Sequence, residues 1–222
     1  DTAEVMLELN PDGSVTCYNT WEQMGQGADV GTLVHTHEAL RPLGLRPDQI
    51  RLDLNDTAYC PNTGPSAGSR QHYMAGHATI LAANKLMDAM RKDDGTWRTY
   101  DEMVAEGIPT KYSGKHVEPK ERTQPVDDLI GTGTNVPEFN YIVMVAEVEV
   151  DTQTGKTRCV GARGVANIGV VGNYLAVEGQ AYGGFSQCVG FALTENYTNY
   201  NGKNLSMAGC GAPTCSDVPD NM

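Results

Sequence analysis

The sequence lacks several patterns that point to common functional classes. Its 222 residues contain no apolar run near the ~20 residues that a membrane-spanning helix needs. There is no Cys-x-x-Cys pair to hold zinc or an iron–sulfur cluster. A Walker loop and the Gly-x-Gly-x-x-Gly dinucleotide fingerprint are also missing. The net charge of -12 argues against a nucleic-acid partner, because such proteins present a basic face.

The composition fits a folded protein. Hydrophobic residues make up 40% of the chain, which is enough for a real core. The six cysteines are too sparse for a disulfide framework, and we expect Cys188, in an apolar helical stretch, to be a buried free thiol. Because the chain starts at Asp1 and residues 216–222 close no domain, we interpret both ends as cuts within a longer protein.

Strands and helices alternate in the first half of the chain. Residues 4–10 alternate apolar and polar side chains and predict a hairpin with 14–18 around Pro11-Asp12-Gly13. Further predicted elements are a helix at 30–40, a strand at 50–54, a helix at 71–91 and a short helix at 100–106. The expected buried stripes of the two long helices are Leu33, Val34, His37, Leu40 and Ile80, Leu81, Ala83, Leu86, Met87, Met90.

The second half begins with a polar stretch and continues into a hairpin. Residues 111–137 contain three prolines and predict a loop. Strands are predicted at 141–151 and 157–167, with Gly155 at the tight turn between them. A helix rich in small residues is predicted at 174–195 and another hairpin at 197–203. Hairpins combined with long helices indicate an α+β fold with mixed sheets.

A glycine-flanked amide, Met24-Gly25-Gln26-Gly27, is the first candidate binding segment. The two glycines allow backbone N–H groups to approach a ligand closely. The amide NH2 group of Gln26 is able to donate to an oxo or carbonyl oxygen. An ordinary turn explains the same tetrapeptide, so the pattern alone leaves both interpretations open.

Small and hydroxyl residues precede a predicted helix in the second candidate segment, residues 61–71. Free N–H groups and the helix dipole favour an anion at such a helix start, and Arg70 would add charge-assisted bonds to phosphate. A capped helix with a surface arginine is the competing interpretation.

Glycines crowd the third segment, 177–195, although each one costs a helix ~1 kcal/mol relative to alanine. Close approach to a cofactor would offset this cost. Tight packing of the helix on a sheet would offset it equally well.

Taken together and in this order, the segments resemble the molybdenum-binding domain of the xanthine oxidase family of molybdenum hydroxylases. The matching patterns are Glu-x-Met-Gly-Gln-Gly at 22–27, Pro-Asn-Thr-x-Pro-x-Ala-x-Ser at 61–69, and the run from Glu178-Gly179 to Leu193-Thr194-Glu195. The strand pair around 147–155 also matches. The resemblance covers nearly all of 1–222, and the loops look closest to the bacterial aldehyde oxidoreductases of sulfate reducers.

The resemblance implies a specific cofactor. Molybdenum would be held by the dithiolene of a pterin, as molybdopterin cytosine dinucleotide, without a direct protein ligand to the metal. Gln26 would hydrogen-bond an oxo group of molybdenum, and Gly25 and Gly27 would allow the loop to approach it. Relatives often have a pterin-contacting glutamine where this chain has Ala176. The pterin and its phosphates would be held by Ala67, Gly68, Ser69, Arg70 and Gln71, above a helix at 178–190.

The resemblance also implies a reaction. An aldehyde would be hydroxylated to a carboxylic acid with water as the oxygen source and a glutamate as general base. That glutamate is expected beyond Met222, and [2Fe-2S] clusters are expected in missing parts of the chain, so the stretch alone should be inactive. Family habit implies a small aldehyde as substrate, flavodoxin or ferredoxin as electron acceptor, a homodimer and a cytoplasmic location, with a periplasmic location as the alternative.

Other interpretations stay open. A purine or xanthine-type hydroxylase and a carbon monoxide dehydrogenase are alternatives within the family, and a non-catalytic α+β interaction module is the alternative outside it. We expect Glu22, Asp29 and Glu38 to be surface charges rather than a hydrolytic carboxylate pair.

The histidines do not suggest a metal site. His35 and His37 would diverge by ~200° on a helix, which excludes a shared metal ion. His72 and His77 flank small residues, and we expect packing or solvent roles for both.

Overall fold

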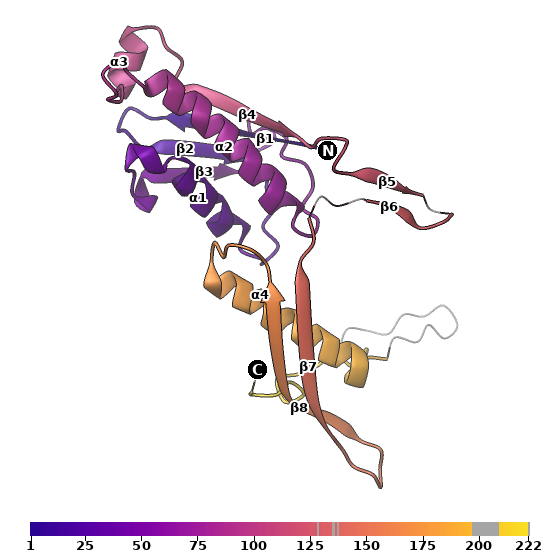
Figure 1. The fold of residues 1–222 in the computed structure, drawn as a ribbon. Helices are drawn as coiled ribbons and strands as arrows, with labels where there is room; N and C mark the ends of the chain where they lie inside the picture. The colour runs from indigo at the N-terminus through magenta and orange to yellow at the C-terminus, as the bar shows by residue number, and fades with distance from the viewer. Residues whose placement is uncertain (128, 135, 137, 197–208, 222) are drawn as a thin grey trace. The chain divides into compact units, whose positions relative to one another are not determined.

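The computed structural model describes residues 1–127, 129–134, 136, 138–196 and 209–221. They form two compact units, Asp1–Pro137 and Glu138–Met222. The centre of the first unit is a mixed four-stranded sheet with the order β3-β2-β1-β4 (Figure 1). Its strands are β1 (Thr2–Leu9), β2 (Val15–Asn19), β3 (Ile50–Leu54) and β4 (Lys111–Val117). β1 runs antiparallel to β2 and β4, and β2 runs parallel to β3.

The alternation of β1 supplies one layer of the core. Ala3, Val5, Leu7 and Leu9 are buried, as expected for a strand with one face on the core. The predicted turn is confirmed: Gly13 has a φ of 77°, and the Asn10 N–H donates to the Ser14 carbonyl at 2.8 Å.

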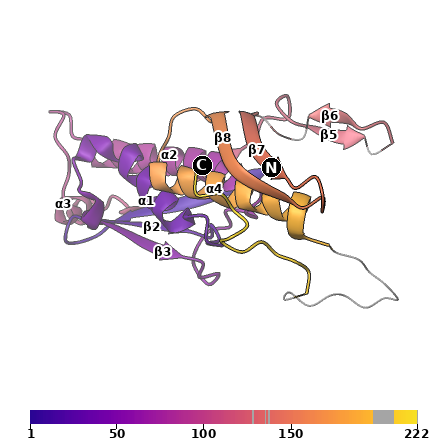
Figure 2. The same ribbon diagram turned by 90° about the horizontal axis from the view of Figure 1, so that it is seen from below.

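Two helices, α1 (Ala28–Ala39) and α2 (Arg70–Met90), contact each other and the sheet (Figures 1 and 2). The short helix α3 (Tyr100–Ala105) begins at a capping box between Thr99 and Glu102. Two 3-10 turns, Arg41–Leu43 and Pro47–Gln49, lead from α1 to β3. All predicted helices of this unit are confirmed within two residues at each end.

The predicted buried stripe of α2 is only partly right. Ile80 and Leu81 are 48% and 39% exposed. Alanines take their place: Ala78 and Ala82 are fully buried where β4 lies against α2, because the strand approaches too closely for larger side chains. Ala83, Leu86, Met87 and Met90 are buried as predicted.

The predicted stripe of α1 is also wrong, apart from Leu40. Thr32 and Thr36 are buried, whereas Leu33 and Val34 are only partly so. Thr32 faces the buried Asn19, whose Nδ2 donates to the Thr32 hydroxyl at 3.4 Å. A polar pair therefore occupies a position for which an apolar stripe was expected.

The prediction of a loop over 111–137 is wrong. The segment contains β4, which pairs with β1, and the small antiparallel pair β5 (Gln124–Asp127) and β6 (Thr132–Thr134). β4 lies at the sheet edge, where lysines and a glycine replace the usual apolar alternation.

The second unit is built from a long hairpin and a helix. β7 (Tyr141–Val150) pairs antiparallel with β8 (Thr157–Asn167), and Gly155 turns between them with a φ of 74°. α4 (Tyr174–Val189) continues into a π-helical turn, Gly190–Thr194. The hairpin predicted at 197–203 lies outside the described residues. Within the described ranges, every helix is too short or too polar to span a bilayer.

Cys188 corrects one expectation about α4. The helix packs Phe185 and Val189 onto Cys159 and Ala162 of β8. Cys188 falls outside that face and is exposed, not buried as predicted.

Candidate functional site

The Gly-Gln-Gly segment is a tight loop that leads directly into α1. Gly25 and Gly27 have φ values of 100° and 87°, a region that favours glycine. The Oε1 atom of Gln23 accepts hydrogen bonds from both glycine N–H groups, each at 3.0 Å. A Cβ at Gly25 would meet nothing within 4 Å, so this side of the loop faces open space.

The side chain of Gln26 is anchored across the same loop. Its Nε2 donates to the Glu22 carbonyl at 2.8 Å, and its Oε1 accepts from the Met24 N–H at 2.6 Å. An amide nitrogen carries two hydrogens, so one N–H of Gln26 stays available to a ligand oxygen.

The two predicted binding segments of the first unit lie together. The Thr20 N–H donates to the Thr63 hydroxyl, and the Thr63 N–H donates to the Thr20 hydroxyl, both at 3.0 Å. The Ser66 N–H donates to Glu22 Oε2 at 2.9 Å. Hydrogen bonding from Ser66 holds the pKa of Glu22 below its usual value, so the carboxylate is charged at neutral pH. Segments 22–27 and 61–71 therefore lie side by side and form one candidate site.

The start of α2 is open on the side of this loop. Ser69 is the N-cap residue but its side chain makes no capping hydrogen bond, and a Cβ at Gly68 would meet nothing within 4 Å. Gln71 is 2% exposed and its Nε2 donates to the Gly64 carbonyl. Its Oε1 is buried without a hydrogen-bond partner in the described structure, and such an acceptor is costly unless a ligand satisfies it.

Arg70 is bound entirely within the chain. Its Nε and Nη2 donate to the two carboxylate oxygens of Asp1, each at 2.6 Å. Nη2 also donates to the Thr2 carbonyl at 2.8 Å, and Nη1 donates to the carbonyls of Thr63 and Pro65 at 3.2 and 3.0 Å. These bonds occupy all five N–H donors of a guanidinium.

The loop before α2 has the sequence Gly-x-Ser-x-Gly at 64–68, which is the pattern of a hydrolase nucleophile elbow. That elbow needs a strand leading into the serine and a histidine beside it. Here residues 61–68 carry no strand, and the Ser66 hydroxyl is buried without a hydrogen-bond partner in the described structure. The hydrolase interpretation is therefore not supported.

His35, His72, His77 and His116 pack against other rings. His35 stacks on Trp21 at 5.7 Å between centroids and lies 4.4 Å from His72. Burial, then the neighbouring His72, lowers the pKa of His35 to about 4, so the ring is neutral at pH 7. His77 stacks on His116 at 4.7 Å. Among the described residues, no three His, Cys, Asp or Glu side chains are placed to bind a metal ion.

Three of the four glycines in the third segment make no close packing contact within the chain. Cβ atoms at Gly179, Gly183 and Gly184 would meet nothing within 4 Å. The tight position is Gly190, where a Cβ would lie 2.6 Å from Pro213 Cδ. Close packing in this segment therefore lies at Gly190, in the π-helical turn near the end of the predicted helix.

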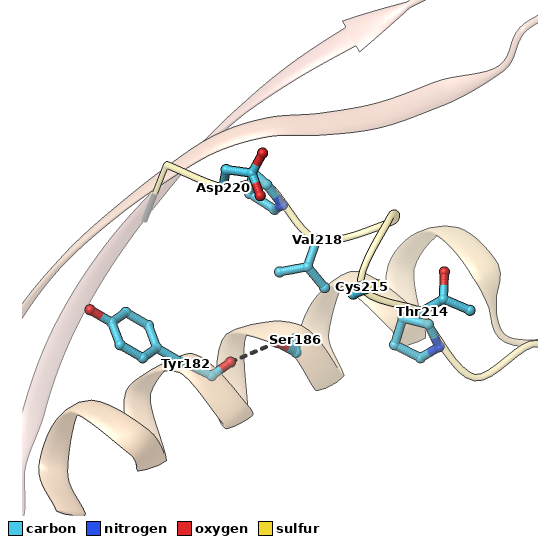
Figure 3. Close-up of a pocket in the computed structure, with 8 residues that line it drawn as sticks. Tyr182, Ser186, Thr214, Cys215, Val218 and Asp220 are labelled. Atoms are coloured by element: carbon cyan, nitrogen blue, oxygen red, sulfur yellow. Dashed lines mark hydrogen bonds between the residues drawn. The ribbon is translucent and has the colours of Figure 1, made fainter. Parts of the chain in front are cut away.

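A cavity of about 560 Å³ in the second unit was not foreseen from the sequence (Figure 3). The Ser186 hydroxyl donates to the Tyr182 carbonyl at 2.8 Å along one wall. Asp217 fixes the opposite segment, since its carboxylate accepts from the N–H and hydroxyl of Thr214. The wall residues are Tyr182, Ser186, Pro213, Thr214, Cys215, Val218, Pro219 and Asp220, none of which is in the predicted site.

Comparison with known proteins gives a consistent result. A family model described as a molybdopterin cofactor-binding domain matches residues 1–219. The aldehyde oxidoreductase of Megalodesulfovibrio gigas is 40% identical over 222 residues, which are 100% of this chain and 24% of that protein. The xanthine dehydrogenase of Oryza sativa subsp. japonica is 28% identical over 241 residues, which cover 99% of this chain and 17% of that protein.

A solved structure shares the whole fold. The aldehyde oxidoreductase from Desulfovibrio desulfuricans ATCC 27774 superimposes with a TM-score of 0.91 at 43% identity and covers 100% of this chain. The match takes up 24% of that structure. The chain therefore spans about a quarter of the length of the aldehyde oxidoreductases that it matches.

Proposed function

Because the chain belongs to the family of molybdopterin cofactor-binding domains, we propose that it forms part of the cofactor cradle of an aldehyde-oxidising molybdenum hydroxylase. The higher identity to an aldehyde oxidoreductase, 40% against 28% for a xanthine dehydrogenase, supports an aldehyde over a purine as substrate. A small aldehyde, a protein electron acceptor such as flavodoxin or ferredoxin, and a homodimer are parts of the same proposal.

One observation carries the proposal: the joined loops 22–27 and 61–71 leave a buried acceptor unsatisfied. Gln71 Oε1 has no partner in the described structure, although the residue is 2% exposed. A pterin ring presents N–H groups that suit such an oxygen. In the same two loops, a Cβ at Gly25 or at Gly68 would meet nothing within 4 Å, which leaves room for a ligand, and the remaining N–H of Gln26 suits an oxo group. The residues present therefore fit a molybdenum pterin.

Each part of the cradle has a distinct role in the proposal. Gly25, Gln26 and Gly27 would lie against the metal end of the cofactor. Ala67, Gly68, Ser69 and Gln71 would hold the pterin and phosphates with the free N–H groups at the start of α2. Arg70 would not contact the cofactor itself but would hold the loop before α2 in place through the carbonyls of Thr63 and Pro65. When bound, the molybdenum pterin supplies the two-electron oxidation chemistry, and we propose the cytosine dinucleotide form, with [2Fe-2S] clusters elsewhere in the longer protein.

The general base is proposed to come from another part of the longer protein. Glu22 is the carboxylate that touches both loops, and its Oε2 accepts from the Ser66 N–H while hydrogen bonding lowers its pKa. A carboxylate held in that way is a poor proton acceptor.

The test uses the native protein with Gln26→Ala and a matched control. Gln153→Ala is the control, because Gln153 is exposed in the β7–β8 turn. We expect molybdenum and pterin near one per chain in the native protein and in both variants. Aldehyde turnover should fall about 100-fold in Gln26→Ala alone, as for the loss of one oxyanion donor.

Two results would contradict the proposal. A native protein free of molybdenum and pterin would remove the enzyme assignment and support the interaction-module alternative. Full turnover in Gln26→Ala would remove Gln26 from the site, and a preference for xanthine over aldehydes would change the substrate class.

A further inference from the structure

Arg70 joins three separate parts of the first unit. Its carboxylate partner, Asp1, and the Thr2 carbonyl belong to the start of β1. The carbonyls of Thr63 and Pro65 belong to the loop before α2, and Arg70 itself is the first residue of that helix. The Arg70 side chain is 14% exposed and that of Asp1 is 48% exposed, so the guanidinium is largely covered while its carboxylate partner is open to solvent.

Three consecutive carbonyls of the loop are held from the first turn of α2. Arg70 binds the carbonyls of Thr63 and Pro65, and Gln71 binds that of Gly64 between them. The position of the Gln71 amide, and with it the unsatisfied Oε1, therefore depends on the path of the loop that Arg70 holds.

Gly64 shows how closely the guanidinium lies on the loop. It has a φ of 81°, and a Cβ there would lie 2.5 Å from Nη2 and 2.8 Å from Nη1 of Arg70. Any side chain at position 64 would push the guanidinium off the loop. Glycine is thus required both by the backbone conformation and by the arginine that covers it.

We propose that Arg70 is a positioning residue of the cofactor cradle and not a phosphate ligand. It fixes residues 63–65, and hence Gln71, in the arrangement that receives the pterin before the cofactor arrives. The inference rests on the proposed function for the identity of the ligand. The internal bonds alone predict how the loop behaves without it.

The two roles predict opposite effects at Asp1. If Arg70 bound a phosphate, removing the competing carboxylate would leave cofactor affinity equal or higher. If Arg70 positions the loop, removing Asp1 breaks the bidentate pair and loosens the same loop. Lysine also separates the roles, because it binds phosphate as a point charge but cannot reproduce the five-donor fork.

The experiment compares Asp1→Asn, Asp1→Ala, Arg70→Lys and Arg70→Ala in the native protein. Arg158→Ala is the control, since Arg158 forms an exposed ion pair with Glu149 in the β7–β8 hairpin. Amide hydrogen exchange over 61–71 is measured on cofactor-free protein. Molybdenum and pterin per chain are measured after purification and again after dialysis.

We expect about tenfold faster exchange over 61–71, with β1–β2 unchanged, and a clear loss of cofactor on dialysis in the Asp1 and Arg70 variants. Arg70→Lys should resemble Arg70→Ala, and Arg158→Ala should resemble the native protein. Normal exchange and full cofactor in the Asp1 variants, with rescue by Arg70→Lys, would overturn the proposal. If Arg70→Ala fails to fold, Asp1→Asn decides. Absence of cofactor from the native protein defeats the proposed function alone, since the exchange result stands by itself.

Discussion

Gly114 is the position at which a single methyl group should do most damage to the first unit. It lies in β4, directly against α2. A Cβ there would be 2.2 Å from the Ala78 carbonyl oxygen and 2.3 Å from the Ala82 nitrogen. Ordinary Cβ contacts are about 3.4 Å or longer, so strand and helix would have to separate by more than about 1 Å.

The magnitude follows from what can move. Overpacking a core typically costs about 1–3 kcal/mol, and the upper end applies here because the obstructing atoms are backbone. Alanine restricts the unfolded chain and returns about 0.4–1 kcal/mol. Gly114→Ala should therefore lower the free energy of unfolding of this unit by about 2 kcal/mol or more.

Amide hydrogen exchange of the native protein measures the effect locally. A loss of about 2 kcal/mol corresponds to roughly 30-fold faster exchange of the protected amides in α2 and β4. Gly179→Ala is the matched control, because a Cβ there meets nothing within 4 Å and the change favours a helix by ~1 kcal/mol. Unchanged exchange in α2 and β4 of Gly114→Ala would refute the close approach of strand and helix.

Three other perturbations test separate features. His35 is neutral in the fold, with a pKa of about 4 against an ordinary 6.5, so its contribution to stability is full above pH 6.5 and is lost as the pH falls toward 4. His35→Phe should therefore weaken the pH dependence of the stability of α1, measured by amide hydrogen exchange. An unchanged pH dependence would contradict this. Burial raises the pKa of Cys17 to about 12, so a thiol reagent should modify Cys188 long before Cys17, and equal labelling rates would count against the core assignment. Gly190→Ala places a Cβ 2.6 Å from Pro213 Cδ and should expose residues 209–221 to earlier proteolysis than in native protein, a difference whose absence would disprove that packing.

The sequence predicted elements wherever the pattern was local. β1, β3, β7 and α2 follow from alternation, from turn residues and from the helix period, and their bounds agree with the structure within two residues. β4 was missed because its burial depends on a glycine, which carries no hydropathy signal. Its pairing with β1 spans more than 100 residues, from Thr2↔Val117 to Glu8↔Lys111.

The candidate site shows the same division between composition and geometry. The residues of both loops were identified from the sequence, and the structure brings the loops together through Thr20, Thr63, Glu22 and Ser66. The role of Arg70 was not predictable, because its charge suits a phosphate and a carboxylate equally. Only the structure shows that Arg70 binds the carboxylate of Asp1, which lies 69 residues away in the sequence.

In β7, the sequence pattern predicts burial, but the side chains are exposed in the structure. Residues 141–146 of β7 are apolar on both faces, which is typical of a strand buried on both sides, whereas Glu147 and Glu149 make the second half alternate. Yet Ile142, Val143 and Val145 are 60%, 70% and 64% exposed. The chain spans about a quarter of the aldehyde oxidoreductases that it matches. The exposed fraction reflects only the neighbours within this chain. The first unit contains the larger cluster of buried side chains and both candidate loops, so its side-chain geometry supports the proposed site.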